Sequence, residues 1–224
     1  MGTILTLTFY LFICLFISRF IGFMLLLRKA SGLSHTAIPG VPGTATAVLF
    51  DIFFLLRLFR TNKWLWAGSW LFHISFMIVI LKHLRYFIEP VPGWIFCVQP
   101  VGRYAGFVLT FSLVYILILR FVNTKIRYVS YRNLFLTAVL LLMSITGLLM
   151  NTVLRQDLIT IKNFMIAAFS LSPEKAPESA IFIIHFSLFL LLLPYLPSHI
   201  LTAPFVIMDA RKREDSLKTV MHEK

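Results

Sequence analysis

Four histidines are the residues of this chain best suited to chemistry. His73 and His83 lie ten residues apart in one apolar stretch, and His185 and His199 lie fourteen apart in another. A polar ring without a partner is costly inside a bilayer. Ten helical residues rise about 15 Å, so each stretch can carry one histidine towards each side of a membrane. The spacing therefore indicates two metal centres stacked across a bilayer.

The composition predicts an all-α integral membrane protein. Of the 224 residues, 59% are hydrophobic and 13% are charged, whereas soluble domains carry about 25% charged residues. Five apolar segments are long enough to cross a bilayer as helices; they cover about residues 3–27, 64–87, 104–122, 133–154 and 180–200. Two shorter apolar segments, near residues 48–59 and 162–171, are typical of interfacial helices.

The basic residues predict how the chain is oriented. Residues 28–63, 120–132 and 211–224 carry fourteen Lys and Arg, whereas the connections on the other side carry six. Because positive charge collects on the cytoplasmic side, the N-terminus is expected outside and the C-terminus inside. We expect residues 1–210 to form one five-helix domain and residues 211–224 a charged cytoplasmic tail. The net charge of +12 lies between apolar spans and does not indicate nucleic-acid binding.

The helix directions turn the four histidines into two pairs. The second span runs outward and the fifth inward, so depth matches His83 with His185 on the outer side and His73 with His199 on the inner side. Two facing imidazoles are a natural axial set for a b-type haem. No Cys, Asp or Glu offers a third ligand for zinc or copper. The alternative is a transporter or proton relay that uses the histidines without haem.

Basic residues near the histidines suit the two propionates of haem. Lys82 and Arg85 flank His83, and Arg103 begins the third span on the same side. An ordinary role as interfacial anchors fits these three residues equally well. Arg19 lies in the inner half of the first span, where it suits an inner propionate or snorkels to the surface.

A quinone headgroup would need a hydrogen-bond donor beside one haem. Near the outer pair five residues could donate this hydrogen bond, and the sequence does not distinguish among them: Lys82, Arg85, Tyr86, Arg103 and Tyr104.

Gly147 in the fourth span permits close approach of a haem or of another helix. The chain has two cysteines, Cys14 and Cys97. An iron–sulfur cluster normally needs four thiolates, so a partner would have to carry one.

The residues around the histidines resemble a known family. Trp70–His83 reads WLFHISFMIVILKH, the fourth span contains SITGLLM, and the fifth ends in PYLPSH at His199. Over about residues 3–210 the chain is similar to the gamma, cytochrome b subunit of respiratory nitrate reductase and its relatives. The interval between His185 and His199 is closer to the heterodisulfide-reductase-like and sulfite-reductase-associated branch.

The resemblance implies a function and a set of partners. It implies two haem b groups, with His83 and His185 holding the outer iron and His73 and His199 the inner one. The chain would be the electron-transfer subunit of a multi-subunit, quinol-dependent oxidoreductase in the cytoplasmic membrane, with menaquinone as the quinone. A cytoplasmic iron–sulfur subunit, heterodisulfide-reductase-like or nitrate-reductase-beta-like, would be its partner. Further membrane and extracytoplasmic subunits would complete the complex.

Overall fold

All regular secondary structure in the described residues is helical. A computed structural model describes residues 2–33, 44–122, 131–172, 174–198, 204–205, 207–208 and 211, and no strand occurs among them. Five helical segments are long and apolar enough to cross a membrane. They cover Gly2–Lys29, Lys63–Tyr86, Gly93–Val122, Tyr131–Thr152 and Ala180–Ser198. The prediction of an all-α protein with five spans is confirmed.

The chain forms two compact units. The first contains residues 1–12 and 64–192, and the second contains residues 13–63 and 193–224. The predicted histidines that the structure describes all lie in the first unit. Its elements are α4 (Lys63–His83), the 3-10 turn η1 (Leu84–Tyr86), α5 (Gly93–Val122), α6 (Tyr131–Thr152), α7 (Leu158–Phe169) and α8 (Ala180–Leu192). The assignment of residues 1–210 to one domain stays a prediction.

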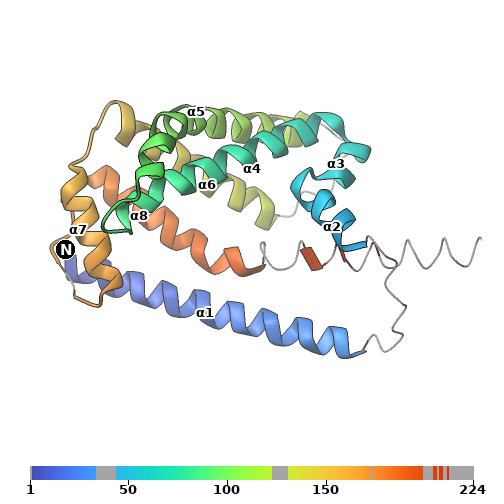
Figure 1. Ribbon diagram of the computed structural model, residues 1–224, viewed down its shortest axis with the longest axis horizontal. Coiled ribbons are helices and arrows are strands. Elements are labelled where there is room, and N and C mark those ends of the chain that lie inside the picture. Colours follow the sequence, from blue (N-terminus) through green and yellow to red (C-terminus); the bar gives the residue numbers. More distant parts are fainter. Residues whose placement is uncertain are drawn as a thin grey trace, which may run out of the picture. The chain divides into compact units, whose positions relative to one another are not determined.

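Helix α5 shows how the first unit is packed. Its buried face repeats at helical spacing through Ala105, Leu109, Ser112 and Ile116. The opposite face is also apolar but exposed, and it carries Phe107, Phe111, Val114 and Ile118. A helix that is apolar on its packed and on its open face suits a lipid environment. Figure 1 shows α5 above α6, with α8 beside α6.

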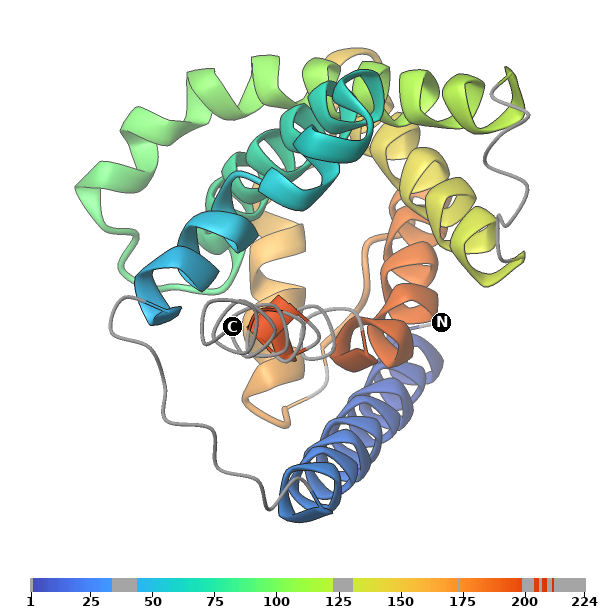
Figure 2. The ribbon, with the colours of Figure 1, turned by 90° about the vertical axis from the view of Figure 1, so that its right-hand side faces the viewer.

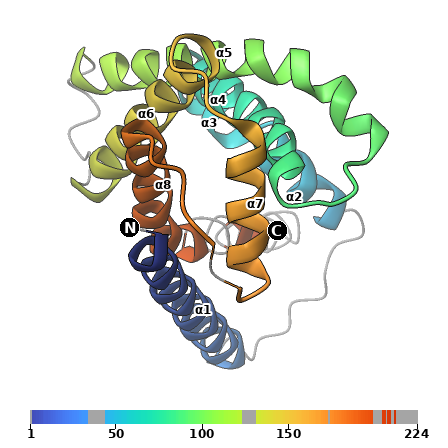
Figure 3. The ribbon, with the colours of Figure 1, turned by 90° about the vertical axis from the view of Figure 1, so that its left-hand side faces the viewer.

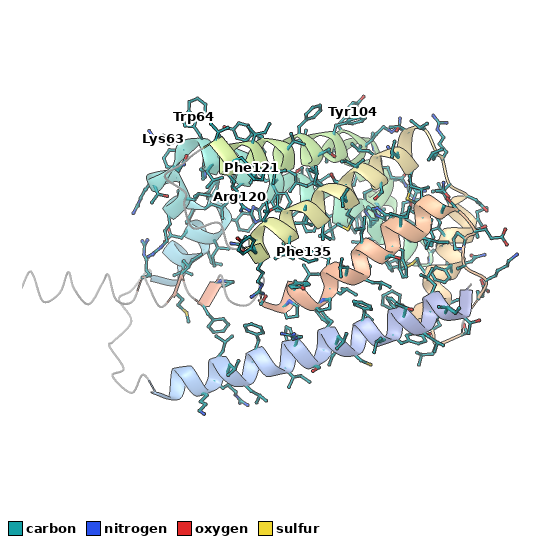
Figure 4. All side chains as sticks on the ribbon, turned by 180° about the vertical axis from the view of Figure 1, so that it is seen from behind. Lys63, Trp64, Tyr104, Arg120, Phe121 and Phe135 are labelled. Atoms are coloured by element: carbon teal, nitrogen blue, oxygen red, sulfur yellow. The ribbon has the colours of Figure 1, made fainter. Side chains whose placement is uncertain are left out.

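Polar side chains join α5 to α6 at two levels. The hydroxyls of Thr110 and Ser144 are 2.9 Å apart. Nearer the end of α5, the guanidinium of Arg120 donates to the Thr137 hydroxyl over 2.9 Å (Figure 4). These bonds satisfy groups that lipid could not, and they fix the register of the two helices.

The third span begins earlier than the sequence suggested, at Gly93 and not near Tyr104. Gly93, Pro100 and Gly102 weigh against a helix in a reading of the sequence. In the structure Pro100 lies inside the helix, and a membrane helix tolerates the hydrogen bond that proline removes. Gly102 is buried against the stem of Lys82, where a Cβ would lie 2.7 Å from Lys82 Cδ. Close packing therefore explains a glycine that the sequence alone presents as a helix breaker.

The short helix α7 is held in the first unit by an aromatic cluster. Helices α7 and α8 lie next to each other (Figure 3), and the fully buried ring of Phe164 lies 5.9 Å from Phe182 and 5.8 Å from Phe186 of α8. Phe9, near the start of α1 (Gly2–Leu33), lies 5.3 Å from Phe169. The Tyr10 hydroxyl donates to the Ala168 carbonyl over 2.9 Å. A short helix predicted near residues 162–171 is thus present as α7, and its place at a membrane surface stays a prediction.

The second unit contains two successive short helices where one was expected near residues 48–59. These are α2 (Thr44–Phe53) and α3 (Leu56–Thr61) (Figure 2). The break falls at Leu55, whose φ of 50° is left-handed and cannot continue an α-helix. In this unit the Arg211 guanidinium lies 2.7 Å from the buried carboxylate of Asp51. The rest of the predicted tail, residues 212–224, lies outside the described residues.

Asp157 determines where α7 begins. Its carboxylate accepts hydrogen bonds from the Thr160 hydroxyl over 2.5 Å and from the Ile159 N–H over 3.0 Å. These bonds hold the pKa of Asp157 below its usual range. A carboxyl with a depressed folded pKa stabilises the native state above its unfolded pKa of about 3.9, and this contribution is lost as the pH falls through the folded pKa.

Replacing the Asp157 cap should therefore loosen the first turn of α7. In Asp157→Ala the amides of Ile159 and Thr160 should exchange with solvent several-fold faster at neutral pH, because the Ala side chain cannot accept a hydrogen bond. Hydrogen exchange followed by mass spectrometry measures this. Asp157→Asn is the matched control, since it keeps an acceptor oxygen and should exchange almost as slowly. Equal protection in Asp157→Ala would show that the cap does not set the helix start.

Candidate functional site

His83 and His185 face each other in the first unit. His83 ends α4 and His185 lies in the first half of α8, and both are half-buried. Their ring centres are 6.4 Å apart and their ring planes differ by 12°. The structure thus brings together the two histidines that the sequence paired on the outer side.

This separation suits two axial ligands on one iron. With a metal–nitrogen bond of about 2 Å on each side, one iron would fit between ring nitrogens of the two imidazoles. Within the described residues, no three His, Cys, Asp or Glu side chains gather at one metal-binding position. A donor set of two imidazoles matches haem, because the porphyrin itself supplies the other four nitrogens.

The hydrogen bonds of the two rings use the same nitrogen. Nδ1 of His83 lies 2.6 Å from the Val79 carbonyl, and Nδ1 of His185 lies 2.9 Å from the Thr146 hydroxyl. A metal-bound histidine commonly engages its other ring nitrogen in this way, which orients the ring. Nε2 of each ring is then the nitrogen available to bind iron.

Gly147 lets α6 approach the His185 ring. A Cβ at this position would lie 3.1 Å from Cε1 and 3.7 Å from Nδ1 of His185. The sequence left open whether Gly147 serves a haem or helix packing. The structure shows that a side chain at this position would press against the histidine ring, which would have to shift by a few tenths of an ångström.

The three basic residues predicted near the outer pair form a cluster. Lys82 and Arg85 flank His83 in the chain, and the Lys82 side chain packs against Gly102, the residue before Arg103. The Lys82 ammonium donates to the Asn151 side chain over 3.1 Å. A cluster of like charges beside two imidazoles suits an anionic group such as a propionate.

Of the predicted inner pair, His73 and His199, the structure describes only His73. His73 of α4 is exposed, and its Nδ1 lies 2.6 Å from the Ser69 carbonyl. His199 lies outside the described residues. Arg19 is exposed on the part of α1 that belongs to the second unit. The pairing of His73 with His199 and the role of Arg19 stay predictions.

A cavity of about 340 Å³ opens beside Tyr86 in the first unit. The Tyr86 ring centre is 5.9 Å from that of His83, and the Arg85 guanidinium lies 5.1 Å from the Tyr86 ring centre. Gln99 of α5 and Asn163 of α7 add amide groups to the cavity wall. The cavity therefore combines an apolar ring with hydrogen-bonding groups close to the outer histidines.

An ion pair lies in the wall of this cavity. Lys162 of α7 pairs with Glu89, and both side chains line the cavity. The Glu89 side chain is 63% exposed, which gives the cavity wall a carboxylate in contact with water. Of the five quinone-site candidates, Arg85 and Tyr86 line the cavity. Tyr104 is 71% exposed and points away from the neighbouring helices (Figure 4).

Reasoning from the sequence missed several residues of the site. Thr146 and Asn151 lie in an apolar span, where a threonine or asparagine gives no sign of its partner. Glu89 was read as part of a helix-ending turn and Lys162 as part of a separate surface helix. Their pairing depends on how α7 folds back, which the sequence pattern does not reveal.

Two known proteins are similar to this chain in sequence. No protein-family model matches the chain, and neither does any solved structure. A curated protein of Archaeoglobus profundus, named Hdr-like menaquinol oxidoreductase cytochrome b-like subunit, is 27% identical over 182 residues, which are 67% of this chain and 53% of that protein. The protein of the same name from Archaeoglobus fulgidus is 26% identical over 182 residues, 69% of this chain and 55% of its own.

These similarities support the Hdr-like cytochrome b branch. The chain spans about half the length of the curated relatives it matches. The Hdr-like cytochrome b resemblance agrees with the heterodisulfide-reductase-like interval between the two histidines of the fifth span. It also agrees with a multi-pass membrane protein of five apolar helices.

The contact between Gly147 and His185 gives a direct test of the site. Gly147→Ala should push the imidazole out of line with His83, because the added methyl group needs space that the ring occupies. We expect the haem content of the purified protein to fall by half or more, measured as Soret absorbance per chain. Gly106→Ala is the control, since its Cβ would meet only the tip of Leu148, at 3.2 Å. Full haem content in Gly147→Ala would contradict the assignment of His185.

Proposed function

We propose that this chain is a di-haem b subunit of a membrane-bound quinol oxidoreductase. In this proposal it transfers electrons between membrane quinone and a cytoplasmic iron–sulfur partner. The observation that carries the proposal is the facing of His83 and His185, 6.4 Å between ring centres, with Nε2 of each ring available. Bound haem supplies one-electron redox chemistry, and two protein ligands leave no position for oxygen or substrate.

Support for a second haem comes from the matching hydrogen bonds of the two histidines in α4. His73 and His83 each place Nδ1 2.6 Å from the carbonyl four residues earlier, at Ser69 and Val79. The two residues thus have the same ring orientation relative to the helix and the same free nitrogen. We infer that His73 holds the inner iron with His199, and that Arg19 neutralises a propionate there. For the outer iron, the cluster of Lys82, Arg85 and Arg103 takes this role.

The cavity beside Tyr86 suits the head of a quinol. The relatives are named as menaquinol oxidoreductases, and a naphthoquinol offers a flat apolar ring with two hydroxyls. In the proposed pose Tyr86, Gln99 and Asn163 exchange hydrogen bonds with these hydroxyls. Oxidation of the quinol by two electrons breaks both O–H bonds and releases two protons, which Glu89, a carboxylate at the wall, would accept one after the other and pass to water.

The remaining features of the proposal follow from orientation and partners. With the N-terminus outside, protons from the quinol leave on the outer side while electrons move inward, so the step is electrogenic. The iron–sulfur partner docks on the cytoplasmic side, where fourteen of the 21 Lys and Arg are expected. We place the protein in the cytoplasmic membrane, in a complex that includes further subunits.

The haem content of the full chain tests the core of the proposal. A pyridine haemochrome assay should find two haems b per chain. His83→Ala and His185→Ala should each lower this to one, and His73→Ala should lower it to one by removing the other haem. Difference spectra of the single variants separate the two sites, and the double variant His73→Ala/His83→Ala should hold no haem. A wild-type chain without a Soret band would favour a transporter or proton relay instead.

The cavity is tested by removing one hydroxyl. Tyr86→Phe keeps the ring beside His83 and Arg85 but loses a hydrogen bond worth about 1 kcal/mol, or roughly a five-fold change in an equilibrium constant. We expect the KM for a soluble naphthoquinol to rise by about that factor, with the haem spectrum unchanged. Tyr104→Phe carries the same change at a residue that points away, and it should behave as wild type. A larger effect at Tyr104 would move the quinol site out of this cavity.

A further inference from the structure

The two outer histidines differ in what fixes their tautomer. The Nδ1 atom of His83 lies 2.6 Å from the Val79 carbonyl. A carbonyl oxygen can only accept, so Nδ1 of His83 must carry the proton and Nε2 must carry the lone pair. The same reasoning applies to His73 and the Ser69 carbonyl. For His185 the partner is the Thr146 hydroxyl, which can donate or accept.

The other hydrogen bonds of Thr146 decide which role it takes. Its hydroxyl oxygen lies 3.0 Å from the Leu142 carbonyl and 3.0 Å from the Met143 carbonyl. Both carbonyls can only accept, so the single hydroxyl proton is directed to them. Towards His185 the hydroxyl then presents a lone pair. Nδ1 of His185 must therefore donate, and Nε2 is left without a proton.

Gly147 has no side chain that could orient the ring, and the neighbouring Thr146 offers the ring a side-chain hydrogen bond from α6. The ring lies against the Gly147 backbone, 3.1 Å from the position of a Cβ, so no side chain at residue 147 can hold it. The neighbouring Thr146 reaches Nδ1 over 2.9 Å. The adjacent pair thus supplies space at one residue and an acceptor at the next.

We propose that Thr146 is the positioning residue of the outer site, which fixes His185 in the Nδ1–H tautomer so that Nε2 faces His83 as an iron ligand. This inference rests on the proposed haem function for its consequence, but the tautomer itself does not. A ligand histidine that donates through Nδ1 is a stronger base at Nε2. Thr146 therefore strengthens the bond to iron and favours the ferric state of the outer haem.

The test compares Thr146→Val with Thr146→Ser in the full chain. Valine has the shape of threonine and no acceptor, whereas serine restores the hydroxyl. In Thr146→Val we expect haem to transfer to an excess of apo-globin about 10- to 100-fold faster, the usual cost of removing such a partner. In a spectroscopic redox titration the midpoint potential of one haem should rise while that of the other stays constant. Thr146→Ser should return both readings towards wild type.

Two further variants serve as a control and as a substitute for Thr146→Val. Thr110→Val makes the same substitution at a hydroxyl that bonds Ser144, 2.9 Å away, and it should change neither reading. Thr146→Ala removes the acceptor with a smaller side chain and serves if the valine variant does not fold. Potentials and haem transfer rates equal to wild type in Thr146→Val or Thr146→Ala would overturn the proposal. So would a valine effect that serine does not reverse.

A failure of the haem function would be visible separately. If the wild-type chain holds no haem, its spectrum shows this before any variant is compared. The ¹⁵N spectrum of the histidine-labelled full chain, assigned with His185→Ala, then reads the tautomer directly. Nδ1–H at His185 in the wild type, changing to Nε2–H in Thr146→Val, would support the role of Thr146. Nε2–H in the wild type would overturn it.

Discussion

A polar ring in an apolar helix bundle needs a partner for each nitrogen, and this requirement organises the first unit. In α4 the backbone provides a partner for one nitrogen of each ring, because His73 and His83 each place Nδ1 against the carbonyl four residues earlier. The other nitrogen of each ring is then left for a group outside the helix. For His83 this direction leads to His185, with 6.4 Å between the ring centres. Lipid offers no hydrogen bonds, and in the proposed function a shared iron is the partner that satisfies both rings.

The small polar residues of the membrane-spanning helices also need hydrogen-bond partners. The hydroxyls of Thr8 and Thr152 bond the carbonyl four residues earlier, and that of Ser112 bonds the carbonyl three earlier. Such residues are satisfied within their own helix and do little to join helices. Thr146 likewise bonds the carbonyl four residues earlier, but its hydroxyl oxygen also forms a hydrogen bond with His185 of α8. A local hydrogen bond is thereby extended into one that links α6 to the site.

The sequence predicted the parts of this arrangement that depend on hydropathy and on charge. Hydropathy located five spans, and the charge distribution gave directions that matched His83 with His185 before any coordinates were considered. It could not identify Thr146, because nothing in SITGLLM distinguishes a threonine that bonds its own helix from one that also bonds another. It also began the third span near residue 104, whereas the helix begins at Gly93, because only packing against Lys82 shows why a helix contains Gly102. The pairing of Glu89 with Lys162 was equally hidden, because it joins segments far apart in the chain.

Glycine and threonine at adjacent positions of α6 have opposite effects on the same ring, and both are needed. Gly147 removes the atoms that would hold His185 away from α6, whereas Thr146 supplies the atom that holds it in one orientation. Space alone would leave the ring free to present either nitrogen. An acceptor alone, with a side chain at 147, would find the ring displaced. A ligand that must keep its position through changes in the charge of the iron requires both conditions, and adjacent residues of one helix can provide them without any movement of the backbone.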